Sequence, residues 1–375
     1  MVGYMRIAAV VGTRPQIIKM APVIQEALKQ NLDIEVIHTG QHYDYRLSQV
    51  FFEELELPDP KVNLEVGSGS HAYQTGEIML RLERYLVEGK YTLVLIPGDT
   101  NSALAGALTS VKLGIPVAHV EAGARCYDMS MAEEVNRRLI DHCSKLLFAP
   151  TLNCKRNLEK ESVIGEIYLT GDTMYDVFLR FRDKAEKSDI LEKLNLVDGG
   201  YGLLTLHRAE NVDDPVRLRS ILEGVWKASM EIVFPIHPRT ANRIREFNIS
   251  LEHSNVRVVD PVGYVDMLKL LKHARLVLTD SGGLQKEAFW SKSPCVTLRD
   301  RTEWVETVDM GVNFLVGAST DKIVQTMNFI EEHYELIRER FRENPFGDGC
   351  AASRIVEIIR KYDDVSGRGF FDSLL

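Results

Sequence analysis

The sequence has few cysteines and no long apolar run, and each absence excludes a class of protein. Its five cysteines include no Cys-x-x-Cys pair, and an odd number gives no complete disulfide framework. Cysteines kept as thiols are typical of the cytoplasm, where we expect this chain to be. The first apolar segment, Ile7–Val11, is too short for a signal-peptide core and is predicted to be a strand. No run approaches the ~20 apolar residues of a membrane-spanning helix, so we expect no membrane partner.

An excess of basic residues is also absent, since 45 Lys and Arg stand against 54 Asp and Glu, a formal net charge of −9. Proteins that bind nucleic acid need a basic face to neutralise phosphates, so we expect no nucleic-acid partner. No His-x-x-x-His pair lies on a predicted helix, and we expect no metal. No Gly-x-Gly-x-x-Gly motif follows the predicted first strands, so we expect no dinucleotide and no other cofactor.

What the sequence does contain is an alternation of short apolar runs with stretches of helical period. This pattern, over 375 residues that are 45% hydrophobic and 26% charged, predicts an α/β protein with two doubly wound, Rossmann-like domains. We expect a surface connection at Arg180–Gly200 and a cleft between the domains, where the strands end. The predicted strands are Ile7–Val11, Ile34–His38, Leu93–Ile96, Val117–Val120 and Leu146–Phe148, then Gly202–Leu206, Ile232–Pro235, Val256–Val259, Leu276–Thr279, Cys295–Leu298 and Phe314–Val316.

The segment Leu276–Glu287 carries the strongest single signal. An apolar strand runs into the turn Ser281-Gly282-Gly283 and then into a helix. The glycines let the backbone approach an anion, and the helix N-terminus adds free N–H groups and about half a positive charge. Glu287 follows one turn later, where a carboxylate can accept both hydroxyls of a ribose. A sugar nucleotide fits this pattern, although Ser-Gly-Gly also occurs in such connections for steric reasons alone.

Polar residues also follow the predicted strands of the first half. Arg14 and Lys19 come after Ile7–Val11 and would flank an anion, or would simply be a solvated basic helix start. Asp99 comes after Leu93–Ile96 and is either a functional acid or a helix cap, a role worth ~1 kcal/mol.

Glu121 follows the next strand, beside a glycine, and a charged helix comes after it. On that helix Glu133 and Arg137, like Glu134 and Arg138, are four residues apart. Such pairs are either site residues or ordinary helix-surface ion pairs.

In the second half, His207 and Arg208 follow the strand Gly202–Leu206. They could orient a pyrophosphate or donate a proton to a leaving phosphate. The alternative is a hydrogen-bonded structural histidine.

Together, seven segments resemble the non-hydrolysing UDP-N-acetylglucosamine 2-epimerases, in one order from about Arg6 to Ile359. The resemblance implies the GT-B type of fold, with a sugar-side catalytic domain at 1–175, a UDP-binding domain at 176–348, and a crossing helix and tail at 349–375. It places a last helix at about Ala351–Lys361, crossing back to the N-terminal domain, and implies a cytoplasmic homodimer. The seven segments are Gly12–Lys19, Pro97–Ser102, His119–Arg125, Glu133–Arg137, Leu206–Asn211, Asp280–Ala288 and Asn344–Gly349.

The chemistry of a UDP-sugar supports this resemblance. C2 has no adjacent carbonyl, so an enzyme without a dinucleotide must expel UDP from C1 as a base removes the C2 proton. Re-addition to the resulting 2-acetamidoglucal would then interconvert UDP-GlcNAc and UDP-ManNAc. The resemblance assigns proton handling to Asp99, Glu121 and Glu133, the diphosphate and leaving oxygen to Arg14 and His207, active-site cations to Lys19 and Arg137, and the UDP seat to Ser281, Gly282, Gly283 and Glu287.

Three positions depart from the common family motifs. Gln16 replaces an acid, which would favour an acidic sugar beside Arg14 and Lys19, and Trp304 replaces an arginine. Gln16 and Trp304 both resemble the residues of the subgroup that epimerises UDP-2,3-diacetamido-2,3-dideoxy-glucuronate. This sugar nucleotide is our alternative substrate. Ala209 replaces an arginine that helps bind a second UDP-GlcNAc in allosteric members. Two other functions remain open, a GT-B glycosyltransferase and a non-catalytic UDP-sugar sensor, and the three carboxylates of the first half favour epimerisation over both.

Overall fold

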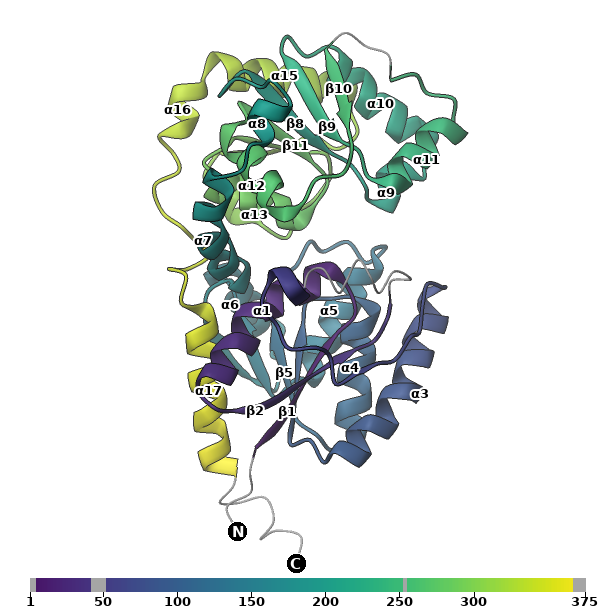
Figure 1. The fold of residues 1–375 in the computed structure, drawn as a ribbon, viewed down its shortest axis with the longest axis vertical. Helices are drawn as coiled ribbons and strands as arrows, with labels where there is room; N and C mark the ends of the chain where they lie inside the picture. The colour runs from purple at the N-terminus through teal and green to yellow at the C-terminus, as the bar shows by residue number, and fades with distance from the viewer. Residues whose placement is uncertain (1–4, 42–51, 252–254, 367–375) are drawn as a thin grey trace, which may run out of the picture. The chain divides into compact units, whose positions relative to one another are not determined.

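The computed structural model describes residues 5–41, 52–251 and 255–366 of the chain. The chain divides into two compact units, each with its own parallel sheet (Figure 1). The first unit comprises residues 1–177 and 345–375, and the second comprises 178–344. The chain therefore passes between the units at 177/178 and 344/345, where the sequence analysis placed the boundaries at 175/176 and 348/349.

The first unit contains a seven-stranded sheet in the order β3-β2-β1-β4-β5-β6-β7. Neighbouring strands are parallel, with Ile7 of β1 opposite both Ile34 of β2 and Leu93 of β4. The strands are β1 (Arg6–Val11), β2 (Asp33–His38), β3 (Val62–Asn63), β4 (Leu93–Pro97), β5 (Val117–Val120), β6 (Leu146–Ala149) and β7 (Glu166–Leu169). The sequence analysis missed β3 and β7. Both are edge strands without a buried apolar run, so they lack the signal that marks a central parallel strand.

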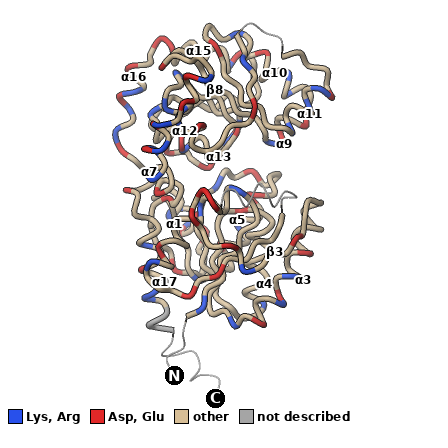
Figure 2. Tube along the Cα trace, viewed as in Figure 1, with Lys and Arg blue, Asp and Glu red and all other residues tan. Residues whose placement is uncertain are grey.

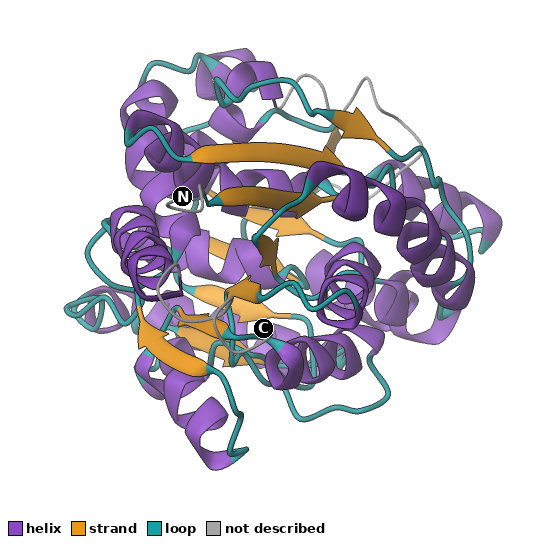
Figure 3. Cartoon of the chain, turned by 90° about the horizontal axis from the view of Figure 1, so that it is seen from below, coloured by secondary structure: helices purple, strands orange, loops and turns teal. Residues whose placement is uncertain are grey.

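Helices lie on both sides of the strands (Figure 3). In α1, Pro15 occupies the first turn, where its missing N–H costs nothing, and Ile17, Met20 and Ile24 are buried at helical spacing. The helices of the first unit are α1 (Arg14–Lys29), α3 (His71–Gly89), α4 (Asn101–Lys112), α5 (Ala132–Cys143), α6 (Leu152–Lys160) and α17 (Ala351–Ser366), with α7 (Thr173–Glu186) continuing into the second unit.

The second unit has a six-stranded parallel sheet in the order β10-β9-β8-β11-β12-β13. The strands are β8 (Tyr201–Thr205), β9 (Glu231–Pro235), β10 (Val256–Val259), β11 (Leu276–Thr279), β12 (Cys295–Thr297) and β13 (Asn313–Leu315). The helices are α8 (Ile190–Lys193), α9 (Ala209–Val212), α10 (Pro215–Trp226), α11 (Pro238–Glu246), α12 (Tyr264–His273), α13 (Gly282–Trp290), α14 (Val305–Asp309), α15 (Thr320–Glu332) and α16 (Tyr334–Arg338). The prediction of two doubly wound α/β domains is confirmed.

The connection predicted at Arg180–Gly200 is partly wrong, because α7 continues to Glu186 and the short helix α8 follows. The helix continues because Val177, Phe181 and Ala185 are buried at four-residue spacing, an apolar stripe that the many charges of this segment obscure. Lys, Arg, Asp and Glu are interspersed in both units (Figure 2). Among the described helices, none is both long and apolar enough to cross a membrane.

The crossing helix α17 returns to the first unit, as expected, and packs on α1. The carboxylate of Asp176 accepts hydrogen bonds from the first backbone amides of α17, those of Ala351 (3.2 Å) and Ala352 (2.8 Å). Burial raises the pKa of Asp176 to about 6, against the opposing effect of these two bonds. The helix extends to Ser366, five residues beyond the predicted end. Residues 367–375 of the predicted tail lie outside the described residues.

Candidate active site

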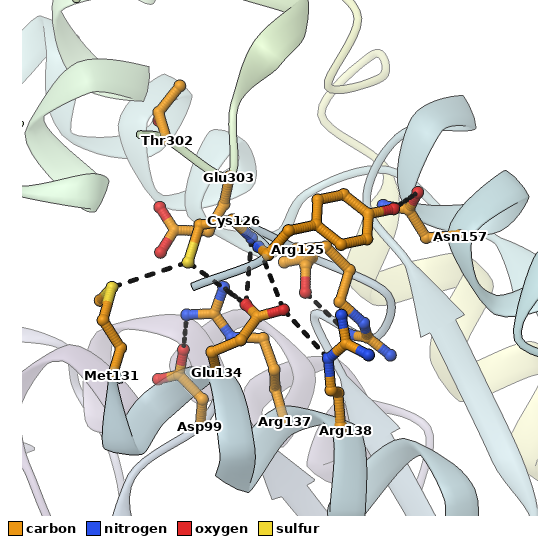
Figure 4. Close-up of polar contacts among 12 residues, drawn as sticks. Asp99, Arg125, Cys126, Met131, Glu134, Arg137, Arg138, Asn157, Thr302 and Glu303 are labelled. Atoms are coloured by element: carbon orange, nitrogen blue, oxygen red, sulfur yellow. Dashed lines mark hydrogen bonds and ion pairs between the residues drawn. The ribbon is translucent and has the colours of Figure 1, made fainter. Parts of the chain in front are cut away.

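Two acid–cation pairs lie at the carboxyl ends of β1, β4 and β5, which are neighbours in the sheet of the first unit. Lys19 Nζ lies 2.5 Å from Glu121 Oε1, and the two side chains are only 14% and 9% exposed. Arg137 Nη2 lies 2.5 Å from Asp99 Oδ2 (Figure 4). The carboxyl ends of parallel strands meet at one edge of a sheet, and this topology brings together segments up to 118 residues apart, from Lys19 to Arg137.

Gly98 connects the two pairs. A Cβ at this position would lie 3.2 Å from Lys19 Nζ and 4.0 Å from Glu121 Oε1. The φ of Gly98 is +64°, which favours glycine, and the next residue is Asp99. The loop that carries Asp99 therefore borders the Lys19–Glu121 pair.

Helix α5 contributes the remaining acid of the predicted set. Glu133 lies in its first turn, partly exposed and one turn before Arg137. The structure selects among the possible ion pairs: Arg137 binds Asp99 and lies 3.4 Å from Glu134, and Arg138 pairs with Glu134 at 3.2 Å.

Glu134 is a residue whose role sequence reasoning missed. Its side chain is fully buried and accepts a hydrogen bond from the backbone amide of Cys126 at 3.0 Å, as Figure 4 shows. It also accepts one from the amide of Tyr127 at 3.2 Å. The spacing to Arg138 was visible in the sequence, but it is equally typical of a surface pair. Only the structure, through the burial of Glu134 and its bonds to these two amides, shows that Glu134 stabilises the loop after Glu121.

Arg14 and Gln16 lie at the start of α1. Arg14 is exposed. Gln16 is 1% exposed; its Oε1 accepts from the amide of Gly12 (2.9 Å) and its Nε2 donates to the carbonyl of Pro97 (2.9 Å). The carboxamide of Gln16 therefore joins two backbone segments, and its effect on the charge beside Arg14 and Lys19 stays a prediction.

Replacing Gln16 with Glu is expected to lower the free energy of unfolding by about 1–3 kcal/mol, because a carboxylate cannot donate to Pro97 O and leaves it unsatisfied. Urea denaturation measures this loss. The Gln16→Met variant is the control for volume, because it keeps the side-chain size and removes both hydrogen bonds. A Gln16→Glu protein as stable as the wild type, with an altered preference between neutral and acidic sugars, would instead favour a substrate-reading role for position 16.

The predicted nucleotide seat lies at the start of α13 in the second unit. Ser281 precedes the helix and its Oγ accepts from the amide of Leu284 at 3.3 Å. A Cβ on Gly282 would lie 3.9 Å from a guanidinium nitrogen of Arg208. Glu287 lies on α13 and is buried. The structure thus places Ser281, Gly282, Gly283 and Arg208 around one helix N-terminus.

Asp280 organises the neighbouring His207 segment. Its carboxylate accepts from the backbone amides of His207 and Arg208, at 3.1 and 2.9 Å, and its Oδ1 lies 3.3 Å from His207 Nδ1. Desolvation by the surrounding protein holds the pKa of His207 below its usual range, the guanidiniums of Arg208 and Arg239 add to this, and Asp280 opposes it.

Trp304 belongs to the same unit and is buried. The ammonium of Lys286, on α13, lies 4.2 Å from the centre of its ring, a cation–π contact. The sequence marked Trp304 as unusual but gave no signal for this partner.

Comparison with known proteins decides the family. Residues 26–360 match the family model described as UDP-N-acetylglucosamine 2-epimerase. The chain belongs to this family. It is 45% identical, over 366 residues, to the UDP-N-acetylglucosamine 2-epimerase of Methanocaldococcus jannaschii, with 95% of this chain and 99% of that one covered. The suspected resemblance is confirmed, and a 2-epimerase is an isomerase, not a glycosyltransferase or a non-catalytic sensor.

Two further similarities bear on substrate. The crystal structure of the Methanocaldococcus jannaschii epimerase in complex with UDP-GlcNAc and UDP superposes with a TM-score of 0.88 at 45% identity, covering 95% of this chain and 100% of that one. The UDP-2,3-diacetamido-2,3-dideoxy-D-glucuronate 2-epimerase of Pseudomonas aeruginosa is 43% identical over 370 residues, covering 95% of this chain and 100% of that protein. The relatives of this chain thus include proteins named for each of the two substrates that the sequence suggested.

Proposed function

We propose that this protein interconverts UDP-GlcNAc and UDP-ManNAc by anti elimination of UDP and its re-addition to 2-acetamidoglucal. The observation that carries the proposal is the set of two acid–cation pairs, Asp99–Arg137 and Glu121–Lys19, at one edge of the sheet. The names of similar proteins, including an epimerase structure with UDP-GlcNAc bound, support the choice of substrate.

Proton transfer at the two faces of C2 requires two proton-handling groups. We assign these to Asp99 and Glu121, with Glu133 as the third acid of the set. The adjacent cations Arg137 and Lys19 offset the negative charge that two carboxylates place beside an anionic substrate. This arrangement is suited to a reaction in which UDP leaves as an anion.

We assign nucleotide binding to the second unit. The amides at the start of α13, after Ser281, suit a phosphate, and Arg208 near Gly282 adds a guanidinium to the same position. Glu287 is the ribose-binding candidate. For His207, which is oriented by Asp280, we propose proton exchange with the leaving diphosphate. Arg14, exposed at the start of α1, is the diphosphate-binding candidate of the first unit.

Epimerisation in deuterium oxide tests the mechanism. The purified protein, with UDP-GlcNAc and no added nicotinamide or metal, is expected to form UDP-ManNAc with solvent deuterium at C2, because the abstracted proton resides on an acid that exchanges with water. Product NMR detects the loss of the C2 proton signal. Epimerised product that retains its original hydrogen would rule out elimination with an exchangeable acid.

The same assay distinguishes the two substrates. We expect kcat/KM to be higher for UDP-GlcNAc than for UDP-2,3-diacetamido-2,3-dideoxy-glucuronate. Among the sequence departures that suggested the acidic sugar, Gln16 has a structural role. A ~100-fold preference for the diacetamido acid, a difference of about 2.7 kcal/mol in transition-state binding, would reverse the assignment.

We further propose that the protein is a cytoplasmic homodimer. Helix α3 presents Tyr73, Leu80 and Val87 to solvent, 48%, 68% and 59% exposed, and their seven-residue spacing places them on one face. The five cysteines form no disulfide with one another, consistent with a reducing compartment. Sedimentation analysis is expected to show a dimer that Leu80→Glu shifts toward monomer. Val216→Glu, on α10 of the second unit and 75% exposed, is the control for added negative charge.

A further inference from the structure

A fully buried pair, His119 and Asp141, lies beneath the two loops that carry Asp99 and Glu121. His119 is on β5 and Asp141 is on α5, and both side chains are 0% exposed. His119 Nδ1 lies 2.7 Å from Asp141 Oδ1. Neither residue can touch a substrate, so any effect on the reaction must pass through the loops that they contact.

His119 contacts the Asp99 loop directly. Its Nε2 lies 2.8 Å from the carbonyl oxygen of Gly98, the residue before Asp99. The amide of Gly98 donates to the carbonyl of Val120, at 3.0 Å. The peptide groups on both sides of Gly98 are therefore bound to β5, which fixes the direction in which Asp99 leaves the sheet.

Asp141 contacts the Glu121 loop in the same way. Its Oδ2 accepts from the amide of Gly123 at 3.1 Å, and the carbonyl of Gly123 accepts from Asn157 Nδ2 at 3.0 Å. Glu121 has a φ of +70°, an uncommon conformation for a residue with a side chain. Such a backbone persists only where surrounding contacts enforce it, and the bonds at Gly123 supply such contacts two residues later.

The hydrogen-bond geometry assigns the charge of the pair. The partners of the two ring nitrogens of His119, a carboxylate oxygen and a backbone carbonyl, are both acceptors, so both nitrogens must donate, as only an imidazolium does. Burial alone would raise the pKa of Asp141, but the charges of His119 and Arg125 hold it below its usual range. Arg125 Nη2 lies 2.7 Å from Asp141 Oδ2 and also binds Glu161, so the buried charges are balanced.

We propose that His119 and Asp141 are positioning residues that set the separation and orientation of Asp99 and Glu121. The kinetic part of this inference rests on the proposed epimerase function. Proton transfer is sensitive to placement, and a displacement of 1 Å can cost on the order of 10²-fold in rate. Because the pair lies beneath the loops, its loss should change catalysis without changing nucleotide affinity.

Three variants separate positioning from mere stability. His119→Phe keeps a planar ring but loses both hydrogen bonds, and kcat is expected to fall on the order of 10²-fold while KM and UDP affinity change by less than about threefold. Asp141→Asn keeps acceptor and size and still allows neutral His119 to donate to Gly98 O, so a smaller loss, about tenfold, is expected. Ile140→Ala, the control, opens a cavity on the same helix, in the core, and is expected to lower stability with kcat unchanged.

A folded His119→Phe protein with the kcat of the wild type would overturn the inference, as would an equal fall of kcat in Ile140→Ala. If His119→Phe does not fold, Asp141→Asn decides, and an unchanged kcat again counts against positioning. Nitrogen-15 NMR of labelled histidine tests the charge of His119 without an activity assay. Both ring nitrogens of His119 are expected to carry a proton, and one unprotonated ring nitrogen would contradict the assigned imidazolium. An inactive wild type that passes this NMR test would place the failure in the proposed function.

Discussion

Replacing Asp99 with Asn is expected to lower kcat by about 10²- to 10⁴-fold, the range of a lost acid–base group, while UDP affinity changes little. The amide keeps the shape of the carboxylate and still accepts a hydrogen bond from Arg137, which lies 2.5 Å from Asp99 in the wild type, so the loop should persist. Initial rates by NMR give kcat, and isothermal titration with UDP gives the affinity.

The control for this variant is Asp33→Asn. Asp33 also pairs with an arginine, Arg6, at 3.6 Å. Both residues are the first of their strands, so they lie at the amino ends of the strands, whereas Asp99 follows the carboxyl end of β4. Loss of charge there should leave kcat unchanged. A comparable loss of kcat in both variants would show that Asp99 takes no part in proton transfer. A loss of UDP affinity in Asp99→Asn equal to the loss of kcat would show the same.

The second large effect is expected from Glu121→Gln, with a fall in kcat of the same order, 10²-fold or more. Glutamine keeps the length of the side chain and can accept a hydrogen bond from Lys19, but it cannot take up a proton at neutral pH. If Asp99 and Glu121 serve opposite faces of C2, one of the two variants should still exchange the C2 hydrogen of UDP-GlcNAc for deuterium without forming UDP-ManNAc. Deuterium exchange and epimerisation are followed in the same NMR sample.

Glu166→Gln is the matched control. Glu166 pairs with Lys145 at 2.9 Å at the amino end of β7, so this change also removes a carboxylate from a lysine, away from the proposed site. No change in kcat is expected. A Glu121→Gln protein that retains full epimerase activity would show that the Lys19–Glu121 pair is structural.

The central strands of both sheets were predictable because a strand buried on both faces must be apolar along its length. Leu93–Pro97 and Leu276–Thr279 are fully buried, and their sequences are short, almost entirely apolar runs. The edge strands β3 and β7 escaped prediction because partial exposure relaxes that requirement. The last turns of α7 were not predicted as helix because charged residues separate their buried residues in the sequence.

Two of the candidate acids, Asp99 and Glu121, could be selected from the sequence because each closely follows an apolar strand within a distinctive motif. Their roles stay predictions. Glu134 could not be preferred over Glu133, because neighbouring helix residues have the same spacing to an arginine and only packing decides which of them is buried. For Gln16, the missing charge suggested a pocket that accepts an acidic sugar, and only the structure shows that its carboxamide binds Gly12 and Pro97.

The sequence by itself determined the family, the order of the central strands along the chain and the chemical groups available, because apolar periodicity and motif spacing are local properties of a chain. The tertiary structure alone decided which charges pair, because ion pairs such as Asp99–Arg137 join segments that meet only when parallel strands align their carboxyl ends. It also decided that His119 and Asp141 are buried beneath the loops that carry Asp99 and Glu121. Burial and hydrogen-bond partners are set by residues distant in sequence, and no local pattern specifies them.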